Sequence, residues 1–358
     1  MRIAIDNRVI KFSGIGIYNT NLSDNYIKLG HKVFLYDDEL KISRSKFVYK
    51  YINFFIRIIK ENSYVNKWLH DNSIDIYHVT KNFGVPLFSS IPIVVTIHDI
   101  IPHLFPQQYL KNTVERIYYE MAIRHSIKKA SKILTVSAFS KQELIKAYGV
   151  KADKIIVIAN GYNEVYKPIK NKELLDGVKE KYRLRGRYIL TFGGSEYRKN
   201  VKRLINVYQK HFSDEYKLVV IGGKWRDIDL ASEYKTDSNI LFLSNVPEQD
   251  LIAIYNLAEI FVFPSFYEGF GIPVLEGMAC GVPVITSDVS SMPEVGGDAA
   301  IYFDPYDEKD MAEKIELVLK DDSLRQEMIS KGLKRVKEYS WEKCAKETLK
   351  VYGEVLHS

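Results

Sequence analysis

The sequence of 358 residues is poor in cysteine, with only Cys280 and Cys344. Two cysteines exclude a disulfide framework and favour a reducing compartment, so we expect a cytoplasmic protein. Long uncharged apolar runs are absent too, which argues against a membrane-spanning helix. The start of the chain lacks the basic stretch and long apolar core that an export signal requires. No zinc-type spacing of Cys and His occurs, and no Gly-x4-Gly-Lys-Ser/Thr phosphate loop.

What the chain does contain is an uneven distribution of charge. Residues 1–165 hold 23 Lys and Arg against 14 Asp and Glu, whereas the remaining residues hold 28 against 31. A basic half indicates either an anionic partner or surface, or simply a solvated basic face. Within it, segment 46–60 fits either a helix at an anionic membrane or a core helix with a basic outer side. The net charge of +6 and the lack of a recognised module argue against nucleic-acid binding.

Short β-branched runs alternate with longer amphipathic stretches, which is typical of parallel sheets covered by helices. The predicted strands form two series: Arg2–Ile5, Lys32–Tyr36, Ile74–His78, Ile93–Ile97, Lys132–Val136 and Ile155–Ile158, then Tyr188–Phe192, Lys217–Ile221, Ile240–Leu243, Ile260–Phe263, Val284–Thr286 and Ala300–Phe303. A polar connector near Asn160 and Gly161 separates them. The pattern predicts an α/β protein with two doubly wound, Rossmann-like domains, residues 1–165 and 166–338, and a last segment 339–358.

The loop after the strand Ile260–Phe263 carries the most informative residues. It contains Gly269 and Gly271 and leads into a helix with a proline near its start. The amides of Phe270, Gly271 and Ile272 would then lie at a helix N-terminus, where backbone donors and the helix dipole bind phosphate. Glu268 and Glu276 bracket this loop. Carboxylates accept hydrogen bonds from sugar hydroxyls, although both acids could simply stabilise the start of the helix.

A second loop, 193–200, contains Gly194, Ser195, Arg198 and Lys199. Adjacent cations suit a diphosphate, but they also suit an ordinary basic helix cap. Two further loops follow predicted strands and would lie at the same edge of the sheet. They contain Lys224 and Val246, and ordinary turns are the competing interpretation.

In the first half, Gly14 and Gly16 follow the first strand, where a flexible turn is the alternative to a binding loop. His98 follows the strand Ile93–Ile97, and a structural histidine is the alternative to a functional one. Ser137 and Ser140 are as consistent with helix caps as with ligands. The pair Asp227 and Asp229 is interpreted as surface rather than as a metal site.

Together these residues resemble the retaining glycosyltransferases of the GT-B fold, in the family-four type. The resemblance rests on Glu268 and Glu276 with seven residues between them, and on the segments Met278–Asp288 and Pro293–Asp298. It is strongest over residues 188–306. It implies two Rossmann-like domains facing across a cleft, and a terminal helix in 339–358 that crosses back to the first domain.

The resemblance also implies roles for the candidate residues. Arg198, Lys199 and the amides of residues 270–272 would bind the donor diphosphate, Glu268 and His98 the transferred sugar, and Glu276 the ribose. The loops with Gly14 and Gly16 would approach the phosphates, and those with Lys224 and Val246 the base. One departure is Gly194, where many relatives carry an arginine.

The C-terminal motifs look most like bacterial enzymes that transfer mannose from GDP-mannose. We therefore expect retaining transfer from a nucleoside diphosphate sugar to a hydroxyl of a glycan or lipid-linked oligosaccharide in surface polysaccharide synthesis, as for lipopolysaccharide. No metal or other cofactor is expected, and the protein would work in the cytoplasm, with or without contact to the inner face of the cell membrane. Three alternatives stay open: a UDP- or dTDP-sugar donor, a sugar-nucleotide epimerase, and a non-catalytic partner of another glycosyltransferase.

Overall fold

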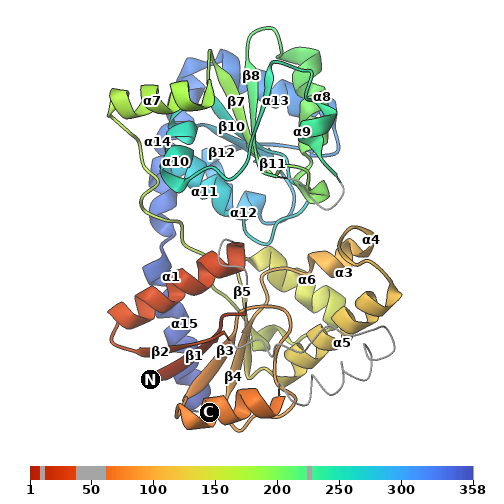
Figure 1. The fold of residues 1–358 in the computed structure, drawn as a ribbon, viewed down its shortest axis with the longest axis vertical. Coiled ribbons are helices and arrows are strands. Elements are labelled where there is room, and N and C mark those ends of the chain that lie inside the picture. The colour runs from red at the N-terminus through yellow and green to blue at the C-terminus, as the bar shows by residue number, and fades with distance from the viewer. Residues whose placement is uncertain (9–12, 38–61, 224–227, 358) are drawn as a thin grey trace. The chain divides into compact units, whose positions relative to one another are not determined.

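The computed structural model describes residues 1–8, 13–37, 62–223 and 228–357. The chain divides into two compact units, Met1–Asn160 together with Trp341–Ser358, and Gly161–Ser340. Each unit contains one six-stranded sheet with helices packed on it (Figure 1). All strand pairs are parallel. This confirms the expected α/β class with two doubly wound sheets.

The sheet of the first unit has the order β2-β1-β3-β4-β5-β6. Its strands are β1 (Arg2–Asp6), β2 (Lys32–Tyr36), β3 (Ile76–Val79), β4 (Ile93–Thr96), β5 (Lys132–Thr135) and β6 (Ile155–Val157). Strand β2 is added on one side of β1 and β3 on the other, so the strand order reverses between β1 and β3, and their carboxyl ends form the switch point where such sheets bind ligands.

The helices of this unit are α1 (Gly14–Lys28), α3 (Ile101–Leu104), α4 (Pro106–Tyr109), α5 (Thr113–Lys129), α6 (Ala138–Tyr148), η1 (Ala152–Lys154) and α15 (Trp341–Leu356). Helix α15 is the end of the chain, yet it packs beside α1 near the beginning (Figure 1). It buries an apolar face that includes Trp341, Ala345 and Tyr352. The first unit is therefore completed by the last residues of the chain.

The sheet of the second unit has the order β12-β11-β10-β7-β8-β9. Its strands are β7 (Tyr188–Phe192), β8 (Lys217–Ile221), β9 (Ile240–Leu243), β10 (Ile260–Phe263), β11 (Val284–Ser287) and β12 (Ala300–Phe303). All four residues of β10 and of β11 are buried, as expected for central strands covered on both faces. Here the switch point lies between β7 and β10.

The helices of the second unit are α7 (Lys172–Tyr182), η2 (Tyr197–Lys199), α8 (Val201–His211), α9 (Leu230–Glu233), α10 (Glu248–Leu257), α11 (Ile272–Ala279), α12 (Met292–Gly296), η3 (Gly297–Ala299), α13 (Glu308–Lys320), α14 (Asp322–Arg335) and η4 (Val336–Glu338). Helix α8 buries one face, including Leu204, Ile205 and Tyr208, against the sheet and α13. The other side of α8 carries the polar residues Lys202 and Lys210.

All twelve predicted strands are present, and β3 begins two residues later than expected, at Ile76. One expectation is wrong in detail. Gly14 and Gly16 do not form a loop before a helix but lie in the first turn of α1, because Ser13 caps the helix and accepts a hydrogen bond from the Gly16 amide. None of the described helices is both long enough and apolar enough to cross a bilayer. Lys224, Asp227 and segment 46–60 lie outside the described residues.

Candidate active site

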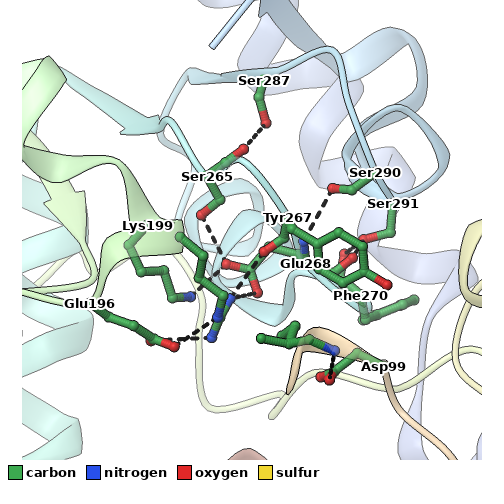
Figure 2. A network of polar contacts seen from close by, with 12 residues as sticks. Asp99, Glu196, Lys199, Ser265, Tyr267, Glu268, Phe270, Ser287, Ser290 and Ser291 are labelled. Atoms are coloured by element: carbon green, nitrogen blue, oxygen red, sulfur yellow. Dashed lines mark hydrogen bonds and ion pairs between the residues drawn. The ribbon is translucent and has the colours of Figure 1, made fainter. Parts of the chain in front are cut away.

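The carboxylate of Glu268 is the centre of a charged cluster at the switch point of the second sheet (Figure 2). Arg198 Nη1 lies 2.5 Å from Glu268 Oε2, and Lys199 Nζ lies 2.7 Å from Oε1. The Ser265 hydroxyl donates a hydrogen bond of 2.8 Å to Oε1. The two cations follow β7 and the acid follows β10, so the sheet order itself brings them together. The sequence predicted these residues but gave Glu268 a role separate from the cations.

Arg198 has a second carboxylate partner. Its Nε donates to Glu196 Oε1 at 2.8 Å, and its Nη1 also lies 3.2 Å from the Tyr267 carbonyl. The Phe266 amide donates to the Arg198 carbonyl at 2.8 Å, which ties the loop after β10 to the loop after β7. Lys199 Nζ lies 4.7 Å from the centroid of the Phe263 ring. Both cations are therefore held in fixed positions rather than extended into solvent.

The charges of this cluster stabilise one another. Burial alone would raise the pKa of Glu268, but Arg198 and Lys199 lower it to about 2, so the group is a carboxylate. Burial lowers the pKa of Lys199, and Glu268 acts against this shift. The cluster of Arg198, Lys199, Glu268 and Glu196 carries no net charge. A polyanionic ligand would therefore have to compete with the two carboxylates for the cations.

The loop that leads into α11 has a backbone suited to a closely approaching ligand. Gly271, the N-cap of α11, has φ of 111°, and a Cβ there would lie 2.5 Å from Met292 Cε. The N-cap residue itself, being glycine, supplies no side-chain cap to this helix end. The Ser291 hydroxyl lies 2.7 Å from the Phe270 carbonyl, and the Ser290 hydroxyl accepts from the Glu268 amide at 3.2 Å (Figure 2). The first amides of α11 are thus fixed where a phosphate could accept from them.

Glu276, on α11, sits in a different environment from Glu268. The Tyr255 hydroxyl donates to Glu276 Oε2 at 3.3 Å, and Tyr166 also bonds to the carboxyl group. Burial raises the pKa of Glu276 to about 7, which these hydroxyls only partly counteract. Glu268 is paired with Arg198 and Lys199, whereas Glu276 forms no ion pair among the described residues. A half-buried carboxylate that already accepts hydroxyl hydrogen bonds is suited to further hydroxyl donors.

The structure explains why position 194 is glycine. Gly194 has φ of 51°, and a Cβ there would lie 2.4 Å from the Gly223 carbonyl oxygen. A side chain would therefore collide with the backbone of the loop after β8. The neighbouring Ser195 amide donates to that same carbonyl at 3.1 Å, and the Ser195 hydroxyl accepts from Leu230. Position 194 is therefore glycine because the loop after β7 packs backbone against backbone with the loop after β8. Ser195 helps to hold these two loops together.

Val246 lies half-buried in the loop after β9, next to Asn245 at φ of 53°. Asp229 accepts a hydrogen bond from Ser232 beside α9. The part of the chain that the structure describes contains no group of three or more His, Cys, Asp or Glu side chains that could hold a metal ion.

In the first unit, His98 follows β4 and lies against the edge of another ring. Its ring centroid is 4.8 Å from that of Tyr18, at 89°. The Thr80 backbone bonds to the imidazole, whereas Nε2 is buried and has no hydrogen-bond partner among the described residues. Burial lowers the pKa of His98 to about 4, so the ring is neutral. A neutral imidazole with one unused nitrogen is able to bond to a ligand hydroxyl.

A buried hydrogen-bond chain behind His98 was missed by the sequence analysis. The Tyr18 hydroxyl lies 3.1 Å from Thr96 Oγ1, which lies 2.7 Å from His78 Nε2. His78 Nδ1 is 2.6 Å from the Tyr352 hydroxyl, which is 3.2 Å from that of Tyr26. We call these five residues the tyrosine–histidine chain. It joins α1, β3, β4 and α15, and no local signal could reveal contacts between residues 274 positions apart.

A second group missed by the sequence analysis lies at the switch point of the first sheet. Arg8 donates to both oxygens of the buried Asp6, at 3.0 and 2.7 Å, and Lys81 Nζ lies 3.6 Å from Asp6. The signal for it was the Asp-x-Arg spacing directly after the first strand. Ser137 and Ser140 have structural roles, since Ser137 caps α6 and the Ser140 hydroxyl donates to the His98 carbonyl.

Comparison with known proteins identifies families for both halves of the chain. Residues 12–165 match the family described as Glycosyltransferase Family 4, and residues 176–335 match Glycosyl transferases group 1. O-antigen chain mannosyltransferase B of Escherichia coli is 38% identical over 79% of this chain and 75% of its own length. O-antigen chain mannosyltransferase RfbU of Salmonella typhimurium is 33% identical over 64% of this chain and 61% of its own length.

Solved structures have the same fold at lower sequence identity. Anabaena Alr3699/HepE in complex with UDP-glucose superimposes with a TM-score of 0.78 at 15% identity, covering 99% of this chain and 100% of that one. The sucrose-phosphate synthase tll1590 from Thermosynechococcus elongatus has a TM-score of 0.78 at 18% identity, covering 100% of this chain and 99% of that one. With both sheets, both family matches and the relatives in agreement, the chain belongs to the GT-B glycosyltransferases of the group 1 and family 4 type.

Proposed function

We propose that this glycosyltransferase transfers mannose from GDP-mannose, with retention of configuration, to a hydroxyl of a glycan or lipid-linked oligosaccharide in surface polysaccharide synthesis. The observation that carries the proposal is the cluster of Arg198, Lys199 and Glu268 at the switch point of the second sheet. The choice of mannose is supported by the names of two similar proteins, both O-antigen chain mannosyltransferases.

The leaving diphosphate gains negative charge as the bond between the sugar carbon and the phosphate oxygen breaks. Arg198, Lys199 and the amides of residues 270–272 would stabilise that charge, because they are preorganised donors with little freedom to reorient. As the diphosphate displaces Glu268 from the cations, this carboxylate becomes available to accept a hydrogen bond from a sugar hydroxyl. The acceptor hydroxyl would lose its proton to an oxygen of the leaving diphosphate.

The other candidate residues orient the donor. Glu276 would accept hydrogen bonds from the ribose diol, and His98 would bond through Nε2 to a hydroxyl of the transferred sugar. Gly194 and Val246 would contact the nucleotide through backbone and apolar groups. Lys224, in the loop after β8, would approach the base. Gly14 and Gly16 would let the first turn of α1 approach the phosphates. The scheme needs no metal, since Arg198 and Lys199 supply the positive charge.

Contact with an anionic membrane is part of the same proposal. The basic character of residues 1–165 and a lipid-linked acceptor are consistent with it. The segment that first indicated such contact, 46–60, is outside the described residues, so it adds no structural argument.

A thermal-shift screen with GDP, UDP, dTDP and ADP, and with their sugars, tests the donor. A ligand at about a hundredfold over its Kd adds about 2.7 kcal/mol to the free energy of unfolding, which is a readable shift in Tm. We expect the largest shift with GDP and GDP-mannose. Product made from GDP-mannose should keep the donor's anomeric configuration by NMR, and inversion would contradict the retaining mechanism.

A UDP-sugar donor is the second candidate, because a protein of the same fold binds UDP-glucose. A shift with UDP and UDP-sugars, but not with GDP, would establish this alternative and contradict GDP-mannose. Stabilisation by none of the nucleotides would favour a non-catalytic partner of another glycosyltransferase. Consumption of the sugar nucleotide without any acceptor would instead indicate an epimerase.

A further inference from the structure

Helix α5 of the first unit is apolar on two opposite sides. One side packs into the unit through Tyr119, Ile123 and Ser126, all of them buried. At about 100° per residue, positions 114, 117, 118 and 121 lie on the opposite side. They are Val114, Ile117, Tyr118 and Met121, and all four side chains are exposed, Ile117 by 55% and Met121 by 67%. We call these four residues the outer face of α5.

The outer face continues toward the loop before β4. His125 Nε2, one turn beyond Met121, lies 3.2 Å from the Pro86 carbonyl. In that loop the Phe88 side chain is 71% exposed, and its ring lies 5.5 Å from Lys129 Nζ. Single exposed apolar side chains are common on proteins, but a contiguous row of this size usually marks an interaction surface.

The exposed charges around the outer face are mostly positive. Lys111, Arg124, Lys128 and Lys129 are exposed at its ends and along its edge. The two acids of the helix have partners of their own, and one partner is Arg124, whose Nε lies 4.0 Å from Glu120 Oε2. Glu115 accepts a hydrogen bond from the Lys111 amide at 2.8 Å, and Glu120 lies 2.6 Å from His103 Nδ1. The face therefore combines large apolar side chains at its centre with cations at its margin.

We propose that the outer face of α5, with Phe88, is a docking surface for an anionic lipid bilayer. Bulky apolar side chains enter the boundary between headgroups and acyl chains, and the surrounding lysines and arginines attract anionic headgroups. A water-soluble protein partner would not require cations on this margin, whereas an anionic bilayer is complementary to both features. The biological role of this surface rests on the lipid-linked acceptor of the proposed function, but vesicle binding itself requires neither donor, acceptor nor catalysis.

The test uses the full chain and sedimented vesicles of phosphatidylglycerol mixed with phosphatidylcholine, with pure phosphatidylcholine vesicles beside them. The variant Ile117→Ser/Met121→Ser removes the centre of the face, and Lys128→Gln/Lys129→Gln removes part of its margin. A matched control, Leu174→Ser/Leu317→Ser, changes side chains of the second unit that are 45% and 47% exposed. All these positions are on the surface, so the variants should fold, and a Tm close to that of the wild type, measured without donor, checks this.

We expect the wild type to bind the anionic vesicles, and less so at high salt. Each of the two test variants should bind about tenfold more weakly or worse, while the control pair binds like the wild type. A Trp introduced by Met121→Trp should shift its emission to the blue on vesicle addition, whereas one introduced by Leu174→Trp should not. This local signal distinguishes insertion of the face from general electrostatic adhesion.

Three results would overturn the inference. The first is a wild type that does not bind anionic vesicles, and the second is an Ile117→Ser/Met121→Ser variant that binds them like the control. The third is a concentration-dependent dimer that this variant dissociates, without any vesicle binding, which would assign the face to a second copy of the chain. The proposed donor specificity survives each of these results, because nucleotide shifts are measured without lipid.

Discussion

The network around Glu268 in the second unit and the tyrosine–histidine chain in the first unit have opposite electrostatic forms, although the first unit also contains the ion pairs of Asp6 with Arg8 and Lys81. In the second unit, Arg198, Lys199 and Glu268 are charged and paired within 2.7 Å. In the first, the tyrosine–histidine chain is neutral throughout: burial lowers the pKa of His78 to about 3, and that of Tyr352 is raised. The sheets are alike, so the difference lies in the residues at and behind their carboxyl edges.

The comparison indicates a division of labour. A charged cluster can exchange one anion for another, because its cations are strongly attracted to any phosphate that enters. A neutral chain cannot compensate new charge, but its directional hydrogen bonds fix the Tyr18 ring, which packs edge-on against His98. Substitutions should therefore affect chemistry most in the second unit and stability most in the first.

The largest effect on activity is expected from Arg198→Ala and from Lys199→Ala. Each removes one cation from Glu268 and from the leaving diphosphate, and loss of one such stabilising donor costs about 10²–10³ in kcat. The measurement is kcat with the sugar nucleotide identified by the thermal-shift screen. Arg187→Ala is the matched control, since Arg187 pairs with Glu259 at 3.0 Å on the surface of the same unit. A kcat within tenfold of the wild type for both variants would remove the charged cluster from the mechanism.

An intermediate effect is expected from pH, through Glu276. Its pKa of about 7 means that the carboxylate is largely protonated at pH 6 and largely ionised at pH 8. A protonated carboxyl accepts fewer hydrogen bonds from the ribose hydroxyls, so donor affinity should fall by up to about tenfold between pH 8 and pH 6. Calorimetric titration measures the donor affinity, using the sugar nucleotide rather than the free nucleotide, whose terminal phosphate has its own pKa of about 6.

Glu276→Gln is the control for this pH dependence. It should bind the donor more weakly than the wild type at pH 8 and with little change down to pH 6. His98 does not interfere, because its pKa of about 4 keeps it neutral over this range. If the variant retained the full pH dependence, the titrating group would be a different one.

The sequence predicted the sheets well and the site only in part. Continuous β-branched runs such as Ile260–Phe263 identify a buried parallel strand without any knowledge of its neighbours. Loop residues such as Arg198 and Glu268 were identified by type and place, but their pairing depends on β7 and β10 being adjacent in the sheet. That adjacency follows from the strand order, not from local sequence.

Other features could not be predicted from the sequence because they depend on distant or backbone contacts. The sequence shows only that Gly194 replaces an arginine of many relatives. The reason is structural, because a Cβ at this position would lie 2.4 Å from the Gly223 carbonyl oxygen. The outer face of α5 escaped notice because apolar residues on two opposite sides of a helix cancel the amphipathic pattern. Tyr352 gave no signal at all, since its partner His78 belongs to the other end of the chain.

The smallest effect on activity is expected from Tyr352→Phe, which removes one hydroxyl from the tyrosine–histidine chain. His78 Nδ1 and the Tyr26 hydroxyl then lose a buried partner, which costs about 1–3 kcal/mol of unfolding free energy. Urea unfolding measures this loss, and kcat should stay near the wild-type value because no reacting group is touched. Tyr64→Phe is the control, since Tyr64 is an exposed tyrosine of the same unit.

Low pH should weaken the tyrosine–histidine chain without any mutation. Burial and the nearby His98 lower the pKa of His78 to about 3, so the folded state binds fewer protons than the unfolded state, in which the histidine has a pKa of about 6.5. The stability contributed by neutral His78 is therefore complete above pH 6.5 and is lost as pH falls from there toward 3. The cluster of Glu268 responds in a lower window, because its carboxylate stays charged down to about pH 2. Between pH 6.5 and 4.5 the first unit should weaken while this cluster stays intact, and His78→Gln should reduce that slope, with the remainder contributed by His98, whose pKa burial lowers to about 4. If instead kcat collapsed in Tyr352→Phe while the unfolding free energy stayed constant, the neutral chain would take part in the chemistry and the division of labour would fail.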